Sequence, residues 1–379
     1  MISLVKIGII LQTSSVLMLF VQTFLAPRLL GAEQYGIGVF LLAPAYIAQG
    51  FFEPICQSEI LIKNRVWAVK QFVYFGALFS MPILVAQIFF ARFEENFPFK
   101  LLLILIIHFT LYLLLTVFSL FAYKENRTLR LAIGQLLGAV IYILILFKLR
   151  DAGFWSMIMG NSALCLVSLA FVWTRLVPPQ QTLPLLPDLN TSRRYISHMM
   201  VRFPVIFLNS ILVVLTGLFY SFYQVSIFKL TTSAVNMLRY VTPINTNQML
   251  KEISDAINSG DKLNEKLKRG LVMFFFWITG SIGILALFKY YTAIVFPGQT
   301  LPVYWWLVPL SGVAFQTIQP LAFLLKELKG VNVLFPAVLP SCILSVFILF
   351  ISNPYFAFAI GAWITALLLC IILYIKLYK

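Results

Sequence analysis

Long apolar stretches alternate with short polar connections along the whole chain. Because a membrane-spanning helix needs about 20 mostly apolar residues, each stretch is long enough to cross a bilayer. This pattern predicts twelve spans, in two sets of six, at 4–24, 37–57, 71–91, 100–122, 131–149 and 154–175, and at 203–222, 224–249, 271–288, 303–325, 331–351 and 355–376. The stretch 224–249 is the least apolar, and we expect it to span because the charge pattern requires it.

The distribution of positive charge predicts the orientation of these spans. With the N-terminus inside, 20 of the 28 Lys and Arg residues fall on cytoplasmic connections and 6 on the opposite side. Cytoplasmic loops of membrane proteins carry such an excess of cations. We therefore expect an all-α polytopic membrane protein with about 12 transmembrane helices and both termini in the cytoplasm.

A polar, proline-rich stretch divides the chain into two sets of six spans. The predicted organisation is an N-terminal six-helix lobe at 1–176, a cytoplasmic linker at 177–202 and a C-terminal six-helix lobe at 203–379. Transporters built from two pseudo-symmetric halves have this layout, with a central cavity between the lobes. A second polar stretch, 251–269, has the charge spacing of a short helix on the membrane surface.

Composition excludes several other classes of protein. The chain has 379 residues, is 61% hydrophobic and has a mean hydropathy of +0.94, which no soluble core requires. Its net charge of +15 lies in short clusters between apolar stretches, so we expect no nucleic-acid partner. The four cysteines form no C-x-x-C pair, and His108 and His198 have no carboxylate or cysteine at ligand spacing. We therefore expect no metal site and interpret both histidines as structural, with their hydrogen bonds satisfied.

A stripe of polar and cationic residues marks the eighth span as the candidate substrate site. Its members recur at spacings of 3 or 4 residues and share roughly 80° of one helical face. They are Lys229, Thr232, Asn236, Arg239, Pro243 and Asn247. Each cation at bilayer depth costs about 2.5–3.5 kcal/mol, which indicates an anionic ligand that offsets this cost. Arginine suits the deeper position because its planar fork binds phosphate oxygens bidentately.

Further polar residues lie in the first two spans. Gln12 and Gln22 share a broad face of the first span, and Gln49 lies in the second. Near the end of the second span, Glu53 is the one acidic residue that the predicted spans place inside the membrane. It is a candidate for a coupling proton or a partner of a cation, or it lies at headgroup level. Enzyme motifs are absent: the sequence has no G-x-x-x-x-G-K-[ST] for ATP, and the predicted outer loops are too short for a catalytic domain.

The first outer connection carries a motif of a known family. Residues 27–36 read PRLLGAEQYG, which resembles the R-x-L-G-x-x-x-Y-G signature of Wzx-type O-antigen and polysaccharide flippases, in the multidrug/oligosaccharidyl-lipid/polysaccharide exporter superfamily. Weaker similarities follow at Gly50–Pro54, at the Phe-Pro-Gly turn 296–298 and at 326–330. Together they extend over most of the chain in the expected order.

The resemblance implies a flippase of the bacterial inner membrane for an undecaprenyl-pyrophosphate-linked oligosaccharide. By position, Arg28 and Arg239 match arginines of related flippases, and they and Lys229 would bind pyrophosphate or acidic sugars. Gln12, Gln22, Gln49 and Asn236 would contact sugar hydroxyls. No cofactor is implied, and coupling to H⁺, Na⁺ or membrane potential stays open. The family also implies a polysaccharide polymerase and a chain-length regulator as partners.

Two alternatives belong to other classes. A cation-coupled multidrug antiporter of the same superfamily would use acidic cavity residues, of which the predicted spans offer Glu53 alone. An O-antigen polymerase would need a large outer loop with paired arginines, which the predicted topology lacks. The chain is also shorter than many flippases, and its first span has no arginine before Arg28, which argues against a peptidoglycan precursor as substrate.

Overall fold

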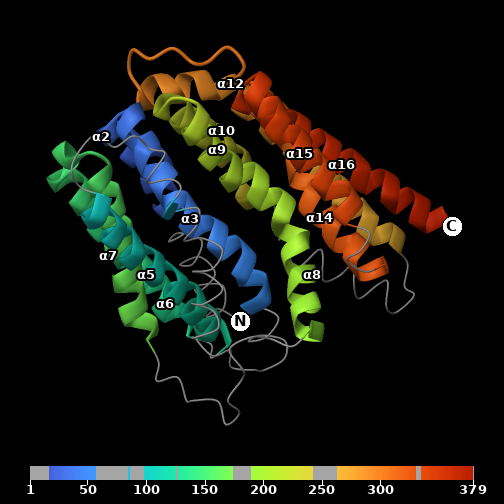
Figure 1. Cartoon of the computed structure of the whole chain (residues 1–379), viewed down its shortest axis with the longest axis horizontal. Helices are drawn as coiled ribbons and strands as arrows, with labels where there is room; N and C mark the ends of the chain where they lie inside the picture. Colours follow the sequence, from blue (N-terminus) through green and yellow to red (C-terminus); the bar gives the residue numbers. More distant parts are fainter. Residues whose placement is uncertain are drawn as a thin grey trace, which may run out of the picture. The chain divides into compact units, whose positions relative to one another are not determined.

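The computed structural model describes residues 17–56, 84–85, 98–124, 127–173, 189–241, 263–329 and 334–378, and these residues are helical apart from short connections (Figure 1). Within them, seven helices are long and apolar enough to cross a membrane, and three shorter apolar helices accompany them. The predicted all-α, multi-pass membrane fold is therefore confirmed. The orientation of the termini stays a prediction, and most of the predicted span 71–91 lies outside the described residues.

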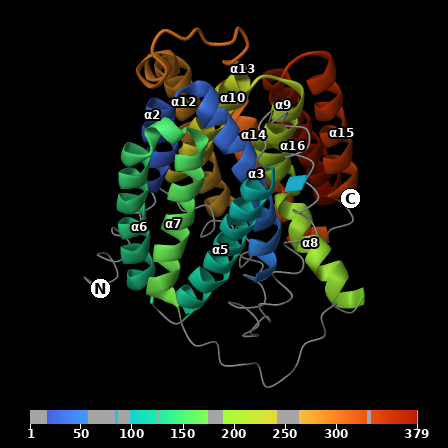
Figure 2. The ribbon, with the colours of Figure 1, turned by 60° about the vertical axis from the view of Figure 1, so that its left-hand side comes forward.

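The described chain divides into two compact units. The N-terminal unit runs to Tyr195 and also includes Tyr220–Ser226. Its elements, named in chain order, are η1 (Val21–Leu25), α2 (Ala26–Leu30), α3 (Ala32–Cys56), α5 (Pro98–Lys124), α6 (Thr128–Lys148), η3 (Arg150–Ala152) and α7 (Phe154–Val172). Helix α7 packs along α6 and α5, and α5 also packs along α3 (Figure 2). The predicted spans 37–57, 100–122, 131–149 and 154–175 agree with α3, α5, α6 and α7 to within a few residues at most ends.

The C-terminal unit comprises Ile196–Phe219 and the residues from Ile227 onward. Its elements are α8 (Leu189–Ile206, which begins in the N-terminal unit), η4 (Phe207–Ile211), α9 (Leu212–Phe219), α10 (Phe222–Val241), α12 (Leu263–Val295), α13 (Leu307–Leu310), α14 (Gly312–Lys329), α15 (Phe335–Ile351) and α16 (Pro354–Tyr378). Helix α16 packs against α15 and α14, and α14 against α12. Phe228 of α10 contacts the rings of Tyr355 and Phe358 of α16 edge-on, so α10 packs against α16 in this unit.

Helix α8 begins at Leu189, so the end of the predicted linker 177–202 is helical, and the division into two lobes and a linker stays a prediction. Two predicted boundaries are wrong. The first helix continues to Leu30, so Pro27 and Arg28 are helical and not part of a loop. Helix α12 has 33 residues and includes 263–270, so these polar residues extend a membrane helix instead of forming a separate surface helix. Polar residues continue a helix readily once its apolar part is anchored, which hydropathy alone does not register.

Two five-residue π-helical turns interrupt the first helix of each unit. In η1 the N–H of Ala26 bonds to the carbonyl of Val21, and in η4 the N–H of Leu212 bonds to that of Phe207. A proline lies close to each turn, Pro27 after the first and Pro204 before the second. Proline removes one N–H and clashes with the carbonyl four residues earlier, so the regular hydrogen-bond ladder shifts there.

Two glycines of the PRLLGAEQYG motif have structural roles. Gly31 ends α2 with φ of 77° and ψ of 167°, an extended conformation with positive φ that essentially only glycine adopts. A Cβ at Gly36 would lie 1.9 Å from the carbonyl oxygen of Phe222, so α3 touches the start of α10 backbone to backbone. The rings of Phe40 and Phe222 pack edge-on beside this contact, with centroids 5.6 Å apart.

Candidate substrate and ion sites

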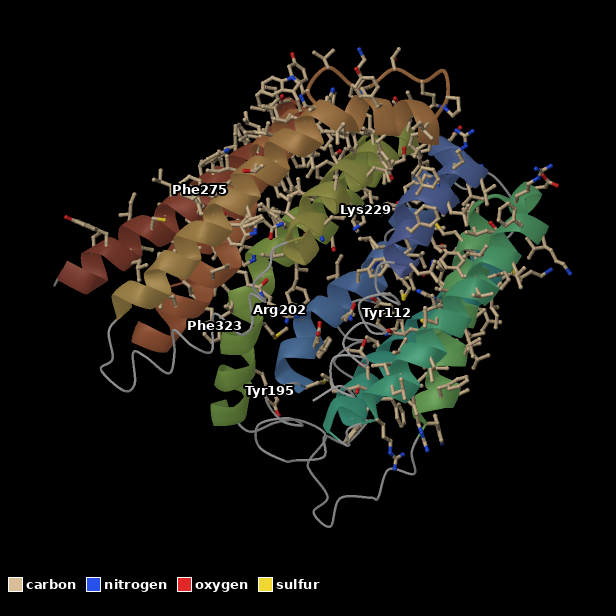
Figure 3. The ribbon with its side chains drawn as sticks, turned by 180° about the vertical axis from the view of Figure 1, so that it is seen from behind. Tyr112, Tyr195, Arg202, Lys229, Phe275 and Phe323 are labelled. Carbon is tan, nitrogen blue, oxygen red and sulfur yellow. The ribbon has the colours of Figure 1, made fainter. Side chains whose placement is uncertain are left out.

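Helix α10 presents the first four residues of the predicted stripe. Lys229 and Asn236 are half-buried, while Thr232 is buried and its hydroxyl donates to the carbonyl of Lys229 at 3.0 Å (Lys229 is labelled in Figure 3). Arg239 lies in the last turn of α10, although its side chain is outside the described part of the structure. The last two members, Pro243 and Asn247, are also outside it, as is Gln12.

Two hydrogen bonds hold α10 against its neighbours in the C-terminal unit. The Nδ2 of Asn236 donates to the Oδ1 of Asn209 in η4 at 2.9 Å. The buried Gln316 of α14 donates from Nε2 to the main-chain carbonyl of Val235 at 2.7 Å. Both bonds lie within one turn of Arg239, so the helical segment that carries this cation is fixed from two sides.

The remaining predicted cation and acid lie near helix ends. Arg28 is exposed on α2, close to the turn at Gly31. Glu53 is half-buried in the last turn of α3. The roles of Arg28 and Glu53 stay predictions.

The N-terminal unit contains a polar network that joins its helices. Gln22 of η1 donates to the Oδ1 of Asn161 of α7 at 3.2 Å. The Nδ2 of Asn161 donates to the hydroxyl of Tyr142 of α6 at 3.0 Å and to the carbonyl of Met157 at 3.0 Å. Gln22 also forms a hydrogen bond with Tyr46 of α3, which extends the network to a fourth element. The side-chain amides of Gln22 and Asn161 therefore link four helical segments: η1, α3, α6 and α7.

A second branch of the network lies on α5. Tyr112 donates its hydroxyl to the Oε1 of Gln49 of α3, and its ring packs edge-on against that of Tyr46, with centroids 5.3 Å apart (Tyr112 is labelled in Figure 3). One turn away, the Nδ1 of His108 lies 3.2 Å from the Oγ of Ser162 of α7. We define the polar network as these side chains: Gln22, Tyr46, Gln49, His108, Tyr112, Tyr142, Asn161 and Ser162.

Sequence reasoning found two members of the polar network, Gln22 and Gln49, and assigned them to sugar binding. Their hydrogen bonds to Asn161 and Tyr112 show that they also join helices. The expectation that His108 has all its hydrogen bonds satisfied is wrong, because its buried Nε2 has no partner among the described residues. An isolated histidine in an apolar stretch could have signalled this, since ionisable residues inside membranes are usually functional.

Comparison with solved structures gives the class of fold. A chain described as lipid II flippase MurJ in an inward closed conformation matches with a TM-score of 0.70 and 11% sequence identity, over 99% of this chain and 88% of that chain. A chain described as an inward-facing multidrug resistance MATE family transporter of the MOP superfamily matches with a TM-score of 0.50 and 13% identity, over 97% and 95%. No protein-family model and no curated protein matches the sequence.

At these identities the likeness is one of fold. The chain therefore has the fold of multi-pass membrane transporters that include a lipid flippase and a drug transporter. A fold hosts many substrates, so the Wzx-type resemblance stays a prediction that the substrate must test.

Proposed function

We propose that the chain is a flippase that moves an undecaprenyl-pyrophosphate-linked O-antigen, or a related polysaccharide repeat unit, from the cytoplasmic to the periplasmic leaflet of a bacterial inner membrane by alternating access. The observation that carries this proposal is the position of Lys229 and Arg239 on α10, in a fold shared with a lipid II flippase. The two residues are ten positions apart, so about 15 Å along the helix axis.

The chemistry of α10 suits a pyrophosphate headgroup. Two cations at different depths can hold the anion in turn as the protein changes conformation, and an arginine can bind two phosphate oxygens at once. The hydrogen bonds from Asn236 to Asn209 and from Gln316 to Val235 keep this part of α10 in place. A preorganised site loses less conformational entropy when the ligand binds.

The other proposed contacts are secondary. Arg28 would meet the headgroup near the outer end of the path, and Gln12, Gln22, Gln49 and Asn236 would contact sugar hydroxyls. Gln22 and Gln49 can serve there only while they keep, or exchange, their hydrogen bonds in the polar network. We also propose a polysaccharide polymerase and a chain-length regulator as partners, which would consume the flipped unit.

Deleting the gene tests the function directly. Lipid-linked single repeat units should then accumulate on the inner face, where a membrane-impermeant glycan reagent added to spheroplasts does not reach them. Accumulation on the outer face would instead indicate a polymerase. Normal surface glycan would contradict both functions.

A charge substitution then tests the site. Complementation with Arg239→Ala should reduce export by roughly 10–100-fold, the worth of a charge-assisted hydrogen bond, while Arg239→Lys should retain part of the activity. The matched control is Lys289→Ala, which removes an exposed cation near the outer end of α12. Normal export by a well-expressed Arg239→Ala protein would refute the assigned role.

A cation-coupled multidrug antiporter is the second candidate, favoured by the match to the MATE family transporter. Cells that lack the gene should then become sensitive to cationic drugs and keep normal surface glycan. Measuring drug tolerance and glycan in the same deletion strain separates the two candidates.

A further inference from the structure

His108 is a buried histidine in the interior of a membrane helix. It lies eight residues inside the apolar span Lys100–Ala122 of α5, about 12 Å along the axis, and its exposed fraction is 2%. Ionisable groups at such positions are rare because burying their charged forms is costly, and histidines found there often relay protons.

The hydrogen bonds around His108 determine its tautomer. Ser162 has one hydroxyl hydrogen, which it donates to the carbonyl of Ile158 at 2.8 Å. With that hydrogen assigned to the Ile158 carbonyl, the 3.2 Å contact between Ser162 Oγ and His108 Nδ1 is a hydrogen bond that Nδ1 donates. Nε2 of the neutral ring then carries a lone pair, and this buried atom has no partner among the described residues.

The surroundings of His108 can also accept its charged form. The ring of Tyr112 lies stacked with the imidazole, with centroids 5.9 Å apart and an interplanar angle of 29°. An imidazolium within about 6 Å of an aromatic face gains a cation–π attraction. Ser162 continues to accept from Nδ1 in both forms of the ring, so the charged form keeps the hydrogen bond of the neutral one.

We propose that Nε2 of His108 is the site at which the transporter binds and releases its coupling proton. This inference rests on the proposed function, and it selects H⁺ among the coupling sources that the sequence left open. A proton from the outer aqueous phase adds to the Nε2 lone pair and forms an imidazolium. Its release to the cytoplasm restores the neutral ring, so one proton moves inward in each cycle.

Protonation at this position has a mechanical consequence. The imidazolium carries a second N–H that needs an acceptor, while the present packing of α5 against α3 and α7 supplies none among the described residues. A conformation that supplies one binds the proton more tightly, so the proton shifts the balance between two packings. The polar network transmits this shift, because it joins α5 to α3 through Gln49 and to α7 through Ser162.

The ionisable groups around this site are few and mostly neutral. On the helices that pack against α5, the described residues supply Glu33, Tyr35, Tyr46, Glu53 and Cys56 of α3, Tyr142 of α6 and Cys165 of α7. Other charged groups on α5 and α6 lie toward the helix ends: Lys100, Arg127, Arg130 and Lys148. Glu53 follows Gln49 by one turn on α3, and Gln49 accepts the hydroxyl of Tyr112, whose ring stacks with His108.

Proton binding can be read without any substrate. The chain has only two histidines, so ¹⁵N-histidine labelling of the full chain in lipid nanodiscs with His198→Gln leaves the signals of His108 alone. We expect a pyridine-type Nε2 signal at high pH that is lost in one titration step as the pH is lowered over the range in which the chain stays folded. A neutral ring throughout that range, in protein that stays folded, would overturn the proposal.

A second experiment tests whether proton binding at His108 is coupled to transport. Proteoliposomes would carry a fluorescent polyprenyl-pyrophosphate oligosaccharide, and an impermeant quencher would report its leaflet. If one proton is coupled to each flipped molecule, a gradient of one pH unit should make the amount of probe in one leaflet about tenfold greater than in the other. His108→Gln should equilibrate the probe near a ratio of one under the same gradient, whereas His198→Gln should behave as the unaltered protein.

The outcomes separate this inference from the proposed function. If the unaltered protein and His108→Gln reach the same ratio, His108 is not the coupling site, although the flippase function stands. If the unaltered protein does not move the probe at all, the proposed function fails, and the titration alone decides whether His108 binds a proton.

Discussion

Replacing Asn161 by Ala tests whether the polar network holds the N-terminal unit together. Asn161 is 4% exposed and makes hydrogen bonds to two other elements, from Gln22 at 3.2 Å and to Tyr142 at 3.0 Å. Interhelical hydrogen bonds in membranes contribute about 0.6 kcal/mol on average and about 1.7 at most. Losing two such bonds costs roughly 1–3 kcal/mol, and removing the acceptor of Gln22 at a half-buried site favours the upper part of that range.

The expected change in melting temperature follows from the size of the unit. For 150–250 residues, 1 kcal/mol corresponds to a shift of roughly 2–4 °C. A loss of about 2–3 kcal/mol therefore lowers the melting temperature by about 4–12 °C. Tyr142→Phe removes one of the two bonds and leaves a ring of the same shape, so we expect a smaller shift than for Asn161→Ala.

The native cysteines provide the assay. Cys56, Cys165 and Cys342 are buried and become reactive toward a fluorogenic thiol dye as the protein unfolds. Cys370 is exposed and would be replaced by Ser to remove the background signal. Melting curves of the variants in nanodiscs then report unfolding of the whole chain.

The control and the refuting result use the same curves. Gln299→Ala removes an exposed amide in the connection before α13 and should stay within about 0.5 kcal/mol of the unaltered protein. If Asn161→Ala shifts the melting temperature no more than Gln299→Ala does, the hydrogen bonds of Asn161 do not stabilise the fold. The reasoning from contacts to stability would then be wrong for this network.

Three further predictions concern backbone conformation and helix contacts. Gly31→Ala should cost about 1–3 kcal/mol, because the backbone at φ of 77° and ψ of 167° is strained for alanine although no atom lies within 4 Å of the added methyl. Gly283→Ala on α12 is equally open and should be neutral or stabilising. Gly36→Ala should reduce the yield of monodisperse protein in size-exclusion chromatography, since the Phe222 carbonyl occupies the place of the methyl; a normal yield would contradict that contact. Gln316→Leu should lower the free energy of unfolding by about 1 kcal/mol and speed hydrogen–deuterium exchange along α10, because it removes the bond to the Val235 carbonyl. Unchanged exchange would show that this bond does not hold α10 in place.

The sequence by itself determined the class of protein and the extent of most described helices. The apolar stretch 100–122, for example, became α5 at Pro98–Lys124, and 355–376 became α16 at Pro354–Tyr378. The bilayer imposes this agreement, because a span must be long enough and must satisfy its own backbone hydrogen bonds. The helical spacing of Lys229, Asn236 and Arg239 likewise follows from the chain alone, once α10 is a helix.

The partners of the polar side chains were decided by tertiary structure alone. Gln22 and Asn161 are 139 positions apart, and Tyr112 and Gln49 are 63 apart, so no local period relates them. Which amide meets which hydroxyl depends on the rotation and depth of each packed helix. The tautomer of His108 depends on this too, because Ser162 directs its only hydrogen to its own helix. Hydropathy identifies the helices that enter the membrane, and packing determines which of their polar groups meet.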